Sequence, residues 1–310
     1  MSKGTAPGIK SWLLLVFLAV IWGASFMGGK IGLTGFGPFM LAAVRICIAA
    51  VALTAFAIFM GAGLPKWRAP QGPRIWAHCL GMALFTNAIP FTLLAWGQLR
   101  VTSGFAGITM AVVPLLVLPL AHFCIEGERM GRWKVLGFVI GFIGTVILVG
   151  GGAIGSQGGP LEGWARLACV GAASCYAIGS IITRLTPEVS TLSFSSAGLL
   201  IAAVITLPIA MLVEGLPQDI NGAAIGAVIY LGLFPTALAT VVLVTIINTA
   251  GPSFLSLVNY QVPVFAVVFG VVLLGESLPG QFLGALALIL TGLALSQFRR
   301  RGPELEVPVR

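Results

Sequence analysis

Three amide side chains lie inside long apolar stretches of this sequence, where polar groups are uncommon. They are Asn87, Asn259 and Gln261, and Tyr260 stands between the last two. An amide both donates and accepts hydrogen bonds, so it can meet either end of a zwitterion. Polar groups in lipid cost free energy and therefore usually face the protein interior or a water-filled cavity. We expect these four residues to contact a bound small molecule.

Prolines interrupt the same apolar stretches. A proline has no backbone N–H and strains the carbonyl four residues earlier, which loses its helical partner. Carbonyls freed in this way can bind an ammonium group, although the prolines could equally serve only to shape the helices. Pro90 and Pro235 fall at related places in two apolar stretches and are expected bending points. The four prolines are Pro90, Pro114, Pro235 and Pro263, which free the carbonyls of Thr86, Met110, Leu231 and Asn259.

One tryptophan and one tyrosine lie near the middle of apolar stretches rather than at their ends. Trp22 and Tyr176 are 154 residues apart, and Lys30 and Arg184 share that spacing. A tryptophan and a tyrosine contributed by two halves of the chain could form apolar walls around a substrate side chain. The alternative is that both rings pack against neighbouring helices.

Two basic residues are candidates for attracting a substrate carboxylate. Arg45 follows Pro38 by seven residues, which is roughly 10 Å along a helix. Its guanidinium could attract a carboxylate or extend to the headgroups at the nearer membrane surface. Lys30, at the end of the first apolar stretch, has the same two interpretations.

Acidic residues are absent from the interior of the apolar stretches, and residues 1–125 contain neither Asp nor Glu. Carriers driven by protons or sodium often use an embedded carboxylate as the ion relay. The sequence therefore favours a facilitator, in which the solute runs down its own gradient. The five cysteines have no metal-type pairing, and no catalytic motif appears, so we expect no metal, no cofactor and no enzyme activity.

Composition indicates what must position these residues. Hydrophobic residues make up 58% of the 310 positions and charged residues 8%, and mean hydropathy is +1.06. A soluble domain carries about 25% charged residues. The fold class is therefore an all-α polytopic membrane protein. A span needs about 20 apolar residues. Ten such runs lie near 11–30, 38–60, 74–97, 103–122, 132–150, 163–183, 191–213, 222–247, 253–274 and 280–298.

Charge sets the expected orientation. With the N-terminus in the cytoplasm, 13 of the 17 Lys and Arg residues lie in inner loops or tails and three in outer ones. Both termini are then cytoplasmic, in an inner (plasma) membrane protein. The net charge of +8 comes from these short clusters, which predicts contact with lipid and none with nucleic acid. A cleaved signal peptide is the alternative for the first run.

The two halves of the chain share a pattern of proline, Gly–Glu and spaced glycines, offset by 147 to 149 residues. It comprises Pro114, Gly127–Glu128, Gly137 and Gly144, then Pro263, Gly275–Glu276, Gly284 and Gly292. With five spans in each half, the second half would enter the membrane from the opposite side, which gives an inverted repeat as in many secondary transporters. We predict a first repeat at 1–150, a Gly-rich linker at 151–162, an inverted repeat at 163–298 and a basic tail at 299–310.

Glycine spacing also predicts close helix contacts. Gly137 and Gly141 in the fifth span, and Gly280 and Gly284 in the tenth, are each four residues apart. Pairs of small residues at this spacing let two membrane helices approach closely.

These residues resemble the EamA-type branch of the drug/metabolite transporter superfamily. The resemblance rests on Trp22–Gly23–Ala24–Ser25–Phe26, on Arg45 and on the doubled Pro, Gly–Glu and Gly pattern, and covers residues 11 to 298. It implies ten helices in two inverted sets of five, with helices 1, 3, 4, 6, 8 and 9 around a central cavity and 5 and 10 outside. Overall, the chain looks most like bacterial exporters of amino acids, including aromatic ones.

The expected function is transport of small organic metabolites, foremost amino acids including aromatic and apolar ones, by alternating access around a central cavity. Export or facilitated movement is the expected mode, by a monomer or weak homo-oligomer. Export of other metabolites or drugs is the alternative, and an intramembrane enzyme or a channel is less well supported by the motifs.

Overall fold

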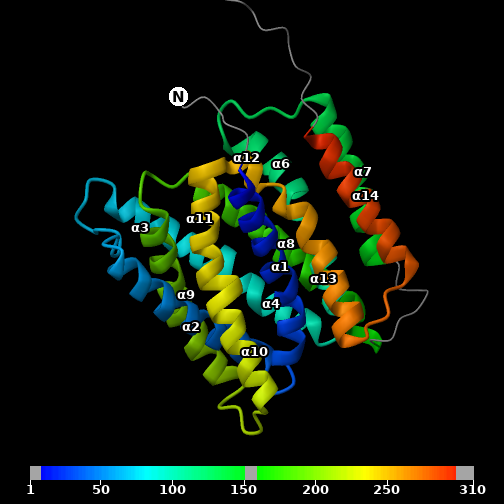
Figure 1. Ribbon diagram of the computed structural model, residues 1–310, viewed down its shortest axis with the longest axis horizontal. Coiled ribbons are helices and arrows are strands. Elements are labelled where there is room, and N and C mark those ends of the chain that lie inside the picture. The colour runs from blue at the N-terminus through cyan, green and yellow to red at the C-terminus, as the bar shows by residue number, and fades with distance from the viewer. Residues whose placement is uncertain (1–7, 151–158, 298–310) are drawn as a thin grey trace, which may run out of the picture.

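The chain folds into a bundle of helices, described by a computed structural model for residues 8–150 and 159–297 (Figure 1). Within those two ranges there is no β-strand. Most of the expected linker at 151–162 and all of the expected tail at 299–310 lie outside the described residues.

The helices follow the apolar runs of the sequence, and several runs are divided into shorter pieces. The first half contains α1 (Ile9–Gly32), α2 (Pro38–Phe59), α3 (Gly72–Met82), the π-helical segment η1 (Ala83–Ala88), α4 (Ile89–Gln98), α5 (Ser103–Met110), α6 (Val113–Cys124) and α7 (Arg132–Gly150). The second contains the short turn η3 (Gly159–Leu161), α8 (Glu162–Arg184), α9 (Thr191–Val213), α10 (Gly222–Gly232), the π-helical η4 (Leu233–Leu238), α11 (Ala239–Ala250), α12 (Pro252–Leu255), α13 (Val258–Leu274) and α14 (Gly280–Ser296).

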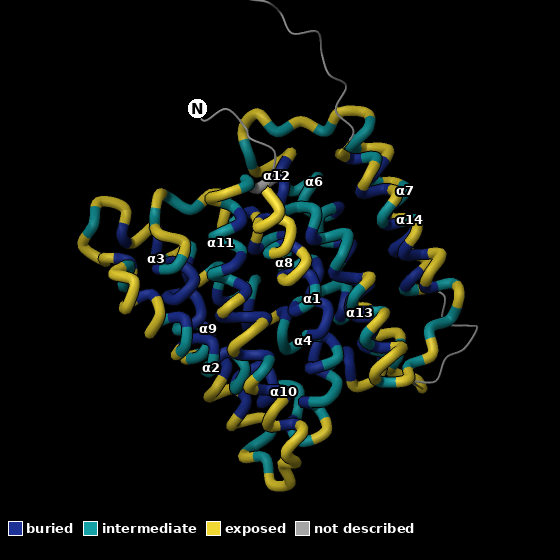
Figure 2. The backbone as a smooth tube through the Cα atoms, in the orientation of Figure 1, coloured by how far each residue is buried: buried dark blue, intermediate teal, exposed yellow. Residues whose placement is uncertain are grey.

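Eight helical stretches of the described chain are long and apolar enough to cross a membrane. Two further apolar helices, α13 and α14, have 17 residues each. Exposed residues follow the outer faces of the bundle, including that of α7 (Figure 2). Many of them have large apolar side chains, such as Phe142 on α7, which is half exposed. A soluble protein of this size would rarely expose so much apolar surface, because water disfavours it. The chain is a multi-pass membrane protein.

Two long helices are interrupted by π-helical turns at corresponding points. Segment η1 lies between α3 and α4, and η4 lies between α10 and α11. Pro90 is the second residue of α4, and Pro235 lies within η4. Because proline cannot donate the usual helical hydrogen bond, a wider π turn accommodates the missing contact.

The other two predicted prolines differ from each other. Pro114 is the second residue of α6, and the helix is broken just before it, between α5 and α6. Pro263 lies inside α13, which continues through it.

Helices α7 and α14 are packed backbone to backbone along one side of the bundle (Figure 1). A Cβ atom on Gly137 would lie 2.3 Å from the Gly292 carbonyl oxygen, and one on Gly292 would lie 2.4 Å from that of Gly137. Only glycine fits at such an approach. The expected contact at Gly280 and Gly284 is wrong, since a Cβ at either would meet nothing within 4 Å. The face of α14 that carries Gly292 is the one turned to α7.

Helices α2 and α9 form a second close pair, and hydrogen bonds tie it at both ends. At one end the Glu214 carboxylate accepts from the backbone amides of Phe39 (3.0 Å) and Met40 (2.8 Å). These donors belong to the first turn of α2, where helices leave amides unpaired. At the other end the Ser193 hydroxyl donates to the carbonyls of residues 62 and 63, at 2.9 and 2.7 Å. The two helices are therefore held in register at both ends.

Candidate functional site

The Arg45 side chain is turned into the bundle, where it meets the broken helix of the second half. Its Nε donates a hydrogen bond to the Thr236 hydroxyl in η4 at 3.0 Å, and its Cζ lies 3.9 Å from the centre of the Phe91 ring. The guanidinium therefore does not extend to the membrane surface, contrary to one of the two expectations. A cation over an aromatic face is attracted by the ring quadrupole, most strongly away from water.

Thr236 links this contact to the disturbed backbone. Its hydroxyl donates to the Leu231 carbonyl at 2.8 Å while accepting from Arg45. Leu231 is the residue whose carbonyl Pro235 was expected to free for an ammonium group. In the structure that carbonyl accepts from Thr236, and one of its two lone pairs is thereby occupied. The Leu231 carbonyl therefore positions the Thr236 hydroxyl, which in turn positions Arg45.

One aromatic ring faces the guanidinium, and a second packs against the first. The guanidinium lies over Phe91, and the Phe91 and Tyr176 ring centres are 6.5 Å apart at an angle of 60°. Rings at this separation and tilt attract each other and provide an apolar wall. Tyr230 directly precedes Leu231, whose carbonyl binds Thr236. We call Arg45, Phe91, Tyr176, Tyr230 and Thr236 the Arg45 cluster.

Helix α1 is fastened to this cluster by two hydrogen bonds. The Trp22 Nε1 donates to the Pro235 carbonyl, and the Tyr230 hydroxyl donates to the Ile21 carbonyl, both at 3.1 Å. Trp22 and Tyr176, expected either to form walls around a substrate side chain or to pack against neighbouring helices, both border the main apolar core. Trp22 is thus bound to the η4 backbone through its polar edge.

Arg45 has no acidic partner in the part of the chain that the structure describes. The ion pairs found there are made by Glu128 and Glu162. Arginine has five N–H donors, and only the Nε donor of Arg45 meets a protein acceptor among the described residues. Arg45 is half-buried, and a cation partly withdrawn from water favours a counter-charge. The two terminal nitrogens of Arg45 are therefore suited to a carboxylate, which they can bind in a bidentate manner.

Within the described chain, Asn87 and Asn259 form hydrogen bonds to nearby backbone and not to residues of this cluster. Asn87 is buried and donates to the Met82 carbonyl at 3.3 Å, while Asn259 donates to the Ser256 carbonyl at 3.1 Å. Each amide thus bonds to nearby backbone. Tyr260 and Gln261 are half-buried on α13, and no hydrogen bond or ring contact among the described residues joins them to Arg45.

Lys30 forms hydrogen bonds to backbone at the end of a neighbouring helix. Its Nζ donates to the carbonyls of Gln98 (2.5 Å) and Val101 (3.0 Å), just past the end of α4. Helix C-termini leave carbonyls unpaired and carry partial negative charge, so a lysine stabilises them. Lys30 joins α1 to α4 there.

Comparison with known proteins places this arrangement in a family. The profile of the EamA-like transporter family matches residues 10–150 and again residues 163–298. The chain belongs to the EamA-like transporter family. Among similar proteins, the inner membrane transporter YedA of Escherichia coli, whose function is uncharacterized, is 30% identical over 270 residues, covering 85% of this chain and 83% of YedA.

Two further comparisons extend over most of the chain. A protein of Streptantibioticus cattleyicolor, described as a probable terminal-alkyne amino-acid exporter, is 28% identical over 302 residues, covering 94% of this chain and 95% of its own. A solved crystal structure shares the fold, with a TM-score of 0.66 and 23% identity, covering 93% of this chain and 97% of the other. This EamA-like chain is thus a membrane transporter, and membership of a transporter family favours a role without catalysis.

The cluster residues that sequence reasoning missed are Phe91, Tyr230 and Thr236. The chain has only three tyrosines, all in apolar stretches, and Thr236 follows a mid-span proline. Those two features could have singled out Tyr230 and Thr236. In this EamA-like transporter, the aromatic members of the cluster come from α4, α8 and α10, with Trp22 on α1. These helices belong to spans 1, 3, 6 and 8, four of the six that the resemblance places around the cavity.

Proposed function

We propose that this transporter carries amino acids, including aromatic and apolar ones, with the substrate carboxylate bound by Arg45. The observation that carries the proposal is an inward-turned guanidinium whose terminal nitrogens have no protein acceptor among the described residues. Arginine is the side chain best suited to a planar carboxylate, because its N–H groups form a rigid fork. Export or facilitated movement is the expected mode.

The surroundings of Arg45 fit the rest of such a substrate. Phe91 and Tyr176 offer ring faces and edges to an apolar or aromatic side chain, and Tyr230 lies on the adjoining helix α10. Ring faces also attract an ammonium group. The similarity to a probable terminal-alkyne amino-acid exporter is consistent with this substrate class.

A carboxylate without an amino group is the second candidate. It is favoured by one observation: the ion pairs and acidic residues of the described chain lie at helix ends and in loops, away from the Arg45 cluster. An ammonium group would therefore meet rings and carbonyls but no carboxylate. Other metabolites or drugs of this type fit the same guanidinium.

We also propose ten crossings in two inverted halves, residues 1–150 and 163–298, with both termini in the cytoplasm. The two separate family matches support two halves, as do the π turns η1 and η4, which begin 150 residues apart. Helices of 17 residues are at the short end of what spans a bilayer, which suits α13 and α14. An even number of crossings also fits α1 beginning and α14 ending at the same end of the bundle (Figure 1).

Uptake into proteoliposomes tests the substrate and the coupling together. We expect saturable uptake of radiolabelled phenylalanine and leucine that an imposed pH gradient does not change, since no acidic side chain lies deep in a described span. A panel that includes 3-phenylpropionate separates amino acids from plain carboxylates. Concentrative uptake driven by the pH gradient would exclude a facilitator, and uptake of neither class would exclude the Arg45 site as proposed.

The amides of α13 provide a second test. We expect Asn259→Ala or Gln261→Ala to lower phenylalanine uptake about fivefold, as for a lost neutral hydrogen bond of about 1 kcal/mol. Gln71→Ala is the matched control, because Gln71 is an exposed amide before α3. Membrane insertion should be intact in all three. Parental uptake by both α13 variants would remove these amides from the substrate path.

A further inference from the structure

Two loops of the transporter contain the pair Gly–Glu, and in both the glycine has a left-handed backbone. Gly127, between α6 and α7, has φ of +83°, and Gly275, at the end of α13, has φ of +65°. Only glycine adopts this conformation without steric cost. The chain turns sharply there, and the following glutamate, Glu128 or Glu276, meets groups from other helices. The two loops lie at opposite ends of the bundle (Figure 1).

Glu276 binds the beginning of α5. Its carboxylate accepts from the Ser103 amide (2.7 Å), the Ser103 hydroxyl (2.9 Å) and the Gly104 amide (3.0 Å). These amides are the unpaired donors of a helix N-terminus, whose partial positive charge favours an anion. Gly270 leaves the space, since a Cβ there would lie 2.4 Å from Glu276 Oε2. The contact joins the α13–α14 loop to α5.

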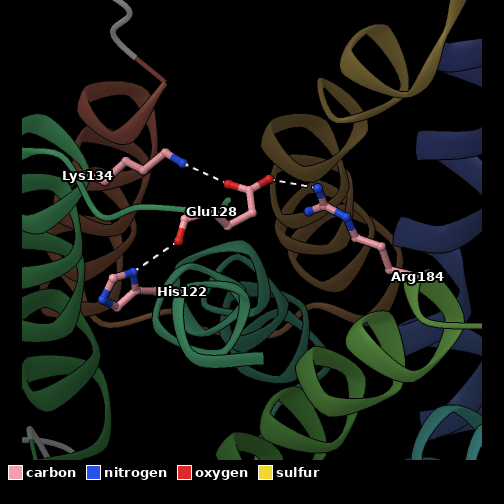
Figure 3. Close-up of polar contacts among 4 residues, drawn as sticks. All are labelled: His122, Glu128, Lys134 and Arg184. Atoms are coloured by element: carbon pink, nitrogen blue, oxygen red, sulfur yellow. Dashed lines mark hydrogen bonds and ion pairs between the residues drawn. The ribbon is translucent and has the colours of Figure 1, made fainter. Parts of the chain in front are cut away.

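Glu128 makes a different set of contacts at the other end (Figure 3). Its carboxylate pairs with Arg184 at the end of α8 (2.7 Å) and with Lys134 at the start of α7 (3.3 Å). Hydrogen bonds from Arg184 and then Lys134 lower the pKa of Glu128. The backbone carbonyl of Glu128 lies 3.1 Å from His122 Nδ1. A cavity of about 180 Å³, lined by these groups and by α6, opens beside the pair.

The two contacts differ in strength. The side chains of Glu128 and Arg184 are 29% and 53% exposed, so water and salt screen their attraction, and such pairs contribute little. The Glu276 carboxylate makes three hydrogen bonds to a helix N-terminus, two of them to amides fixed in the backbone. Charge-assisted bonds to fixed donors are stronger and less dependent on salt.

We propose that Glu276 and Glu128 are latches of unequal strength at opposite ends of the carrier, so that the bundle opens preferentially at the Glu128 end. The proposal rests on the alternating access proposed above, but not on any substrate. By the charge assignment, the Glu128 end is cytoplasmic. The carrier without substrate would then mostly face inward.

Distances between spin labels on the full-length chain in liposomes test this directly. One pair, Arg100→Cys with Ser277→Cys, spans the Glu276 latch, and another, Glu126→Cys with Glu188→Cys, spans the Glu128 latch. All four positions are exposed, and the five native cysteines are replaced. We expect Glu276→Gln to increase the long-distance population of the first pair about tenfold. We expect Glu128→Gln to increase that of the second about twofold, since exposed pairs contribute little.

Glu214→Gln is the matched control, because Glu214 also accepts from a helix N-terminus but lies in the tied α2–α9 pair. It should move neither distance. Ser103→Ala removes one of three donors and should give a smaller shift in the direction of Glu276→Gln, which keeps the test valid if that variant folds poorly. An unchanged first pair in both Glu276→Gln and Ser103→Ala, or a larger effect of Glu128→Gln, would overturn the proposal. The spin-label measurement uses no substrate, so its outcome does not depend on whether the uptake assay detects transport.

Discussion

Replacing Arg45 with glutamine is expected to lower uptake of carboxylate-bearing substrates ~100-fold, because losing a buried charge partner costs about 3 kcal/mol. Glutamine retains a hydrogen-bonding group that can meet Thr236, but it has no charge and no fork of donors. Arg45→Lys keeps the charge without the planar geometry, and an intermediate loss is expected. Initial rates of phenylalanine uptake in proteoliposomes measure both.

Arg100→Gln is the control for this substitution, since it removes the same charge from an exposed loop position. It should retain parental uptake. Phenethylamine, which lacks the carboxylate, offers a sharper comparison: the parent should prefer phenylalanine strongly, and Arg45→Gln should lose that preference. Equal uptake of phenylalanine by Arg45→Gln and the parent would show that the carboxylate is bound elsewhere.

The second large effect is expected at the contact between α7 and α14. Gly292→Leu would place a side chain where a Cβ alone lies 2.4 Å from the Gly137 carbonyl oxygen. Backbone cannot move aside as a flexible side chain can, so the two helices must separate. We expect the free energy of unfolding to fall by about 3 kcal/mol, which is at the upper end for an overpacked contact. Thermal unfolding in detergent would show it as a lower midpoint.

Gly284→Leu makes the same change on the same helix at a position with nothing within 4 Å. Its unfolding midpoint should match the parent. If Gly284→Leu lowered the midpoint as much as Gly292→Leu, helix propensity or lipid packing would be responsible, and the backbone contact would not be the cause.

Hydropathy was sufficient to place the long unbroken helices, but not the breaks within the others. The run predicted at 191–213 coincides with α9 (Thr191–Val213), and that at 163–183 differs by one residue at each end from α8 (Glu162–Arg184). Crossing lipid demands continuous apolar length, which composition records directly. The number of crossings is less easily predicted, because α13 and α14 are short and hydropathy does not encode how a helix is seated in the bilayer.

The candidate site was predicted only in part. Sequence reasoning selected Arg45, Trp22 and Tyr176, since charged and aromatic groups at mid-span are conspicuous. It could not provide the partners: Thr236 is 191 residues from Arg45, and contact across that separation depends on how the helices rotate and pack. Pairing Trp22 with Tyr176 assumed matched roles in the two halves, whereas Trp22 donates to the Pro235 carbonyl.

Glycine motifs show the same limit. Gly280 and Gly284 have the spacing of a packing motif but face open space, while Gly292 makes the contact. Spacing identifies a face of a helix, and several faces of α14 contain small residues. Only the rotation of the helix decides which face is used.

The two-ended fastening of α2 to α9 has a mechanical consequence. Glu214 secures one end and Ser193 the other, so rotation of either helix against its neighbour would break contacts at both ends. Any rearrangement that keeps these hydrogen bonds must move the two helices together, as one rigid body.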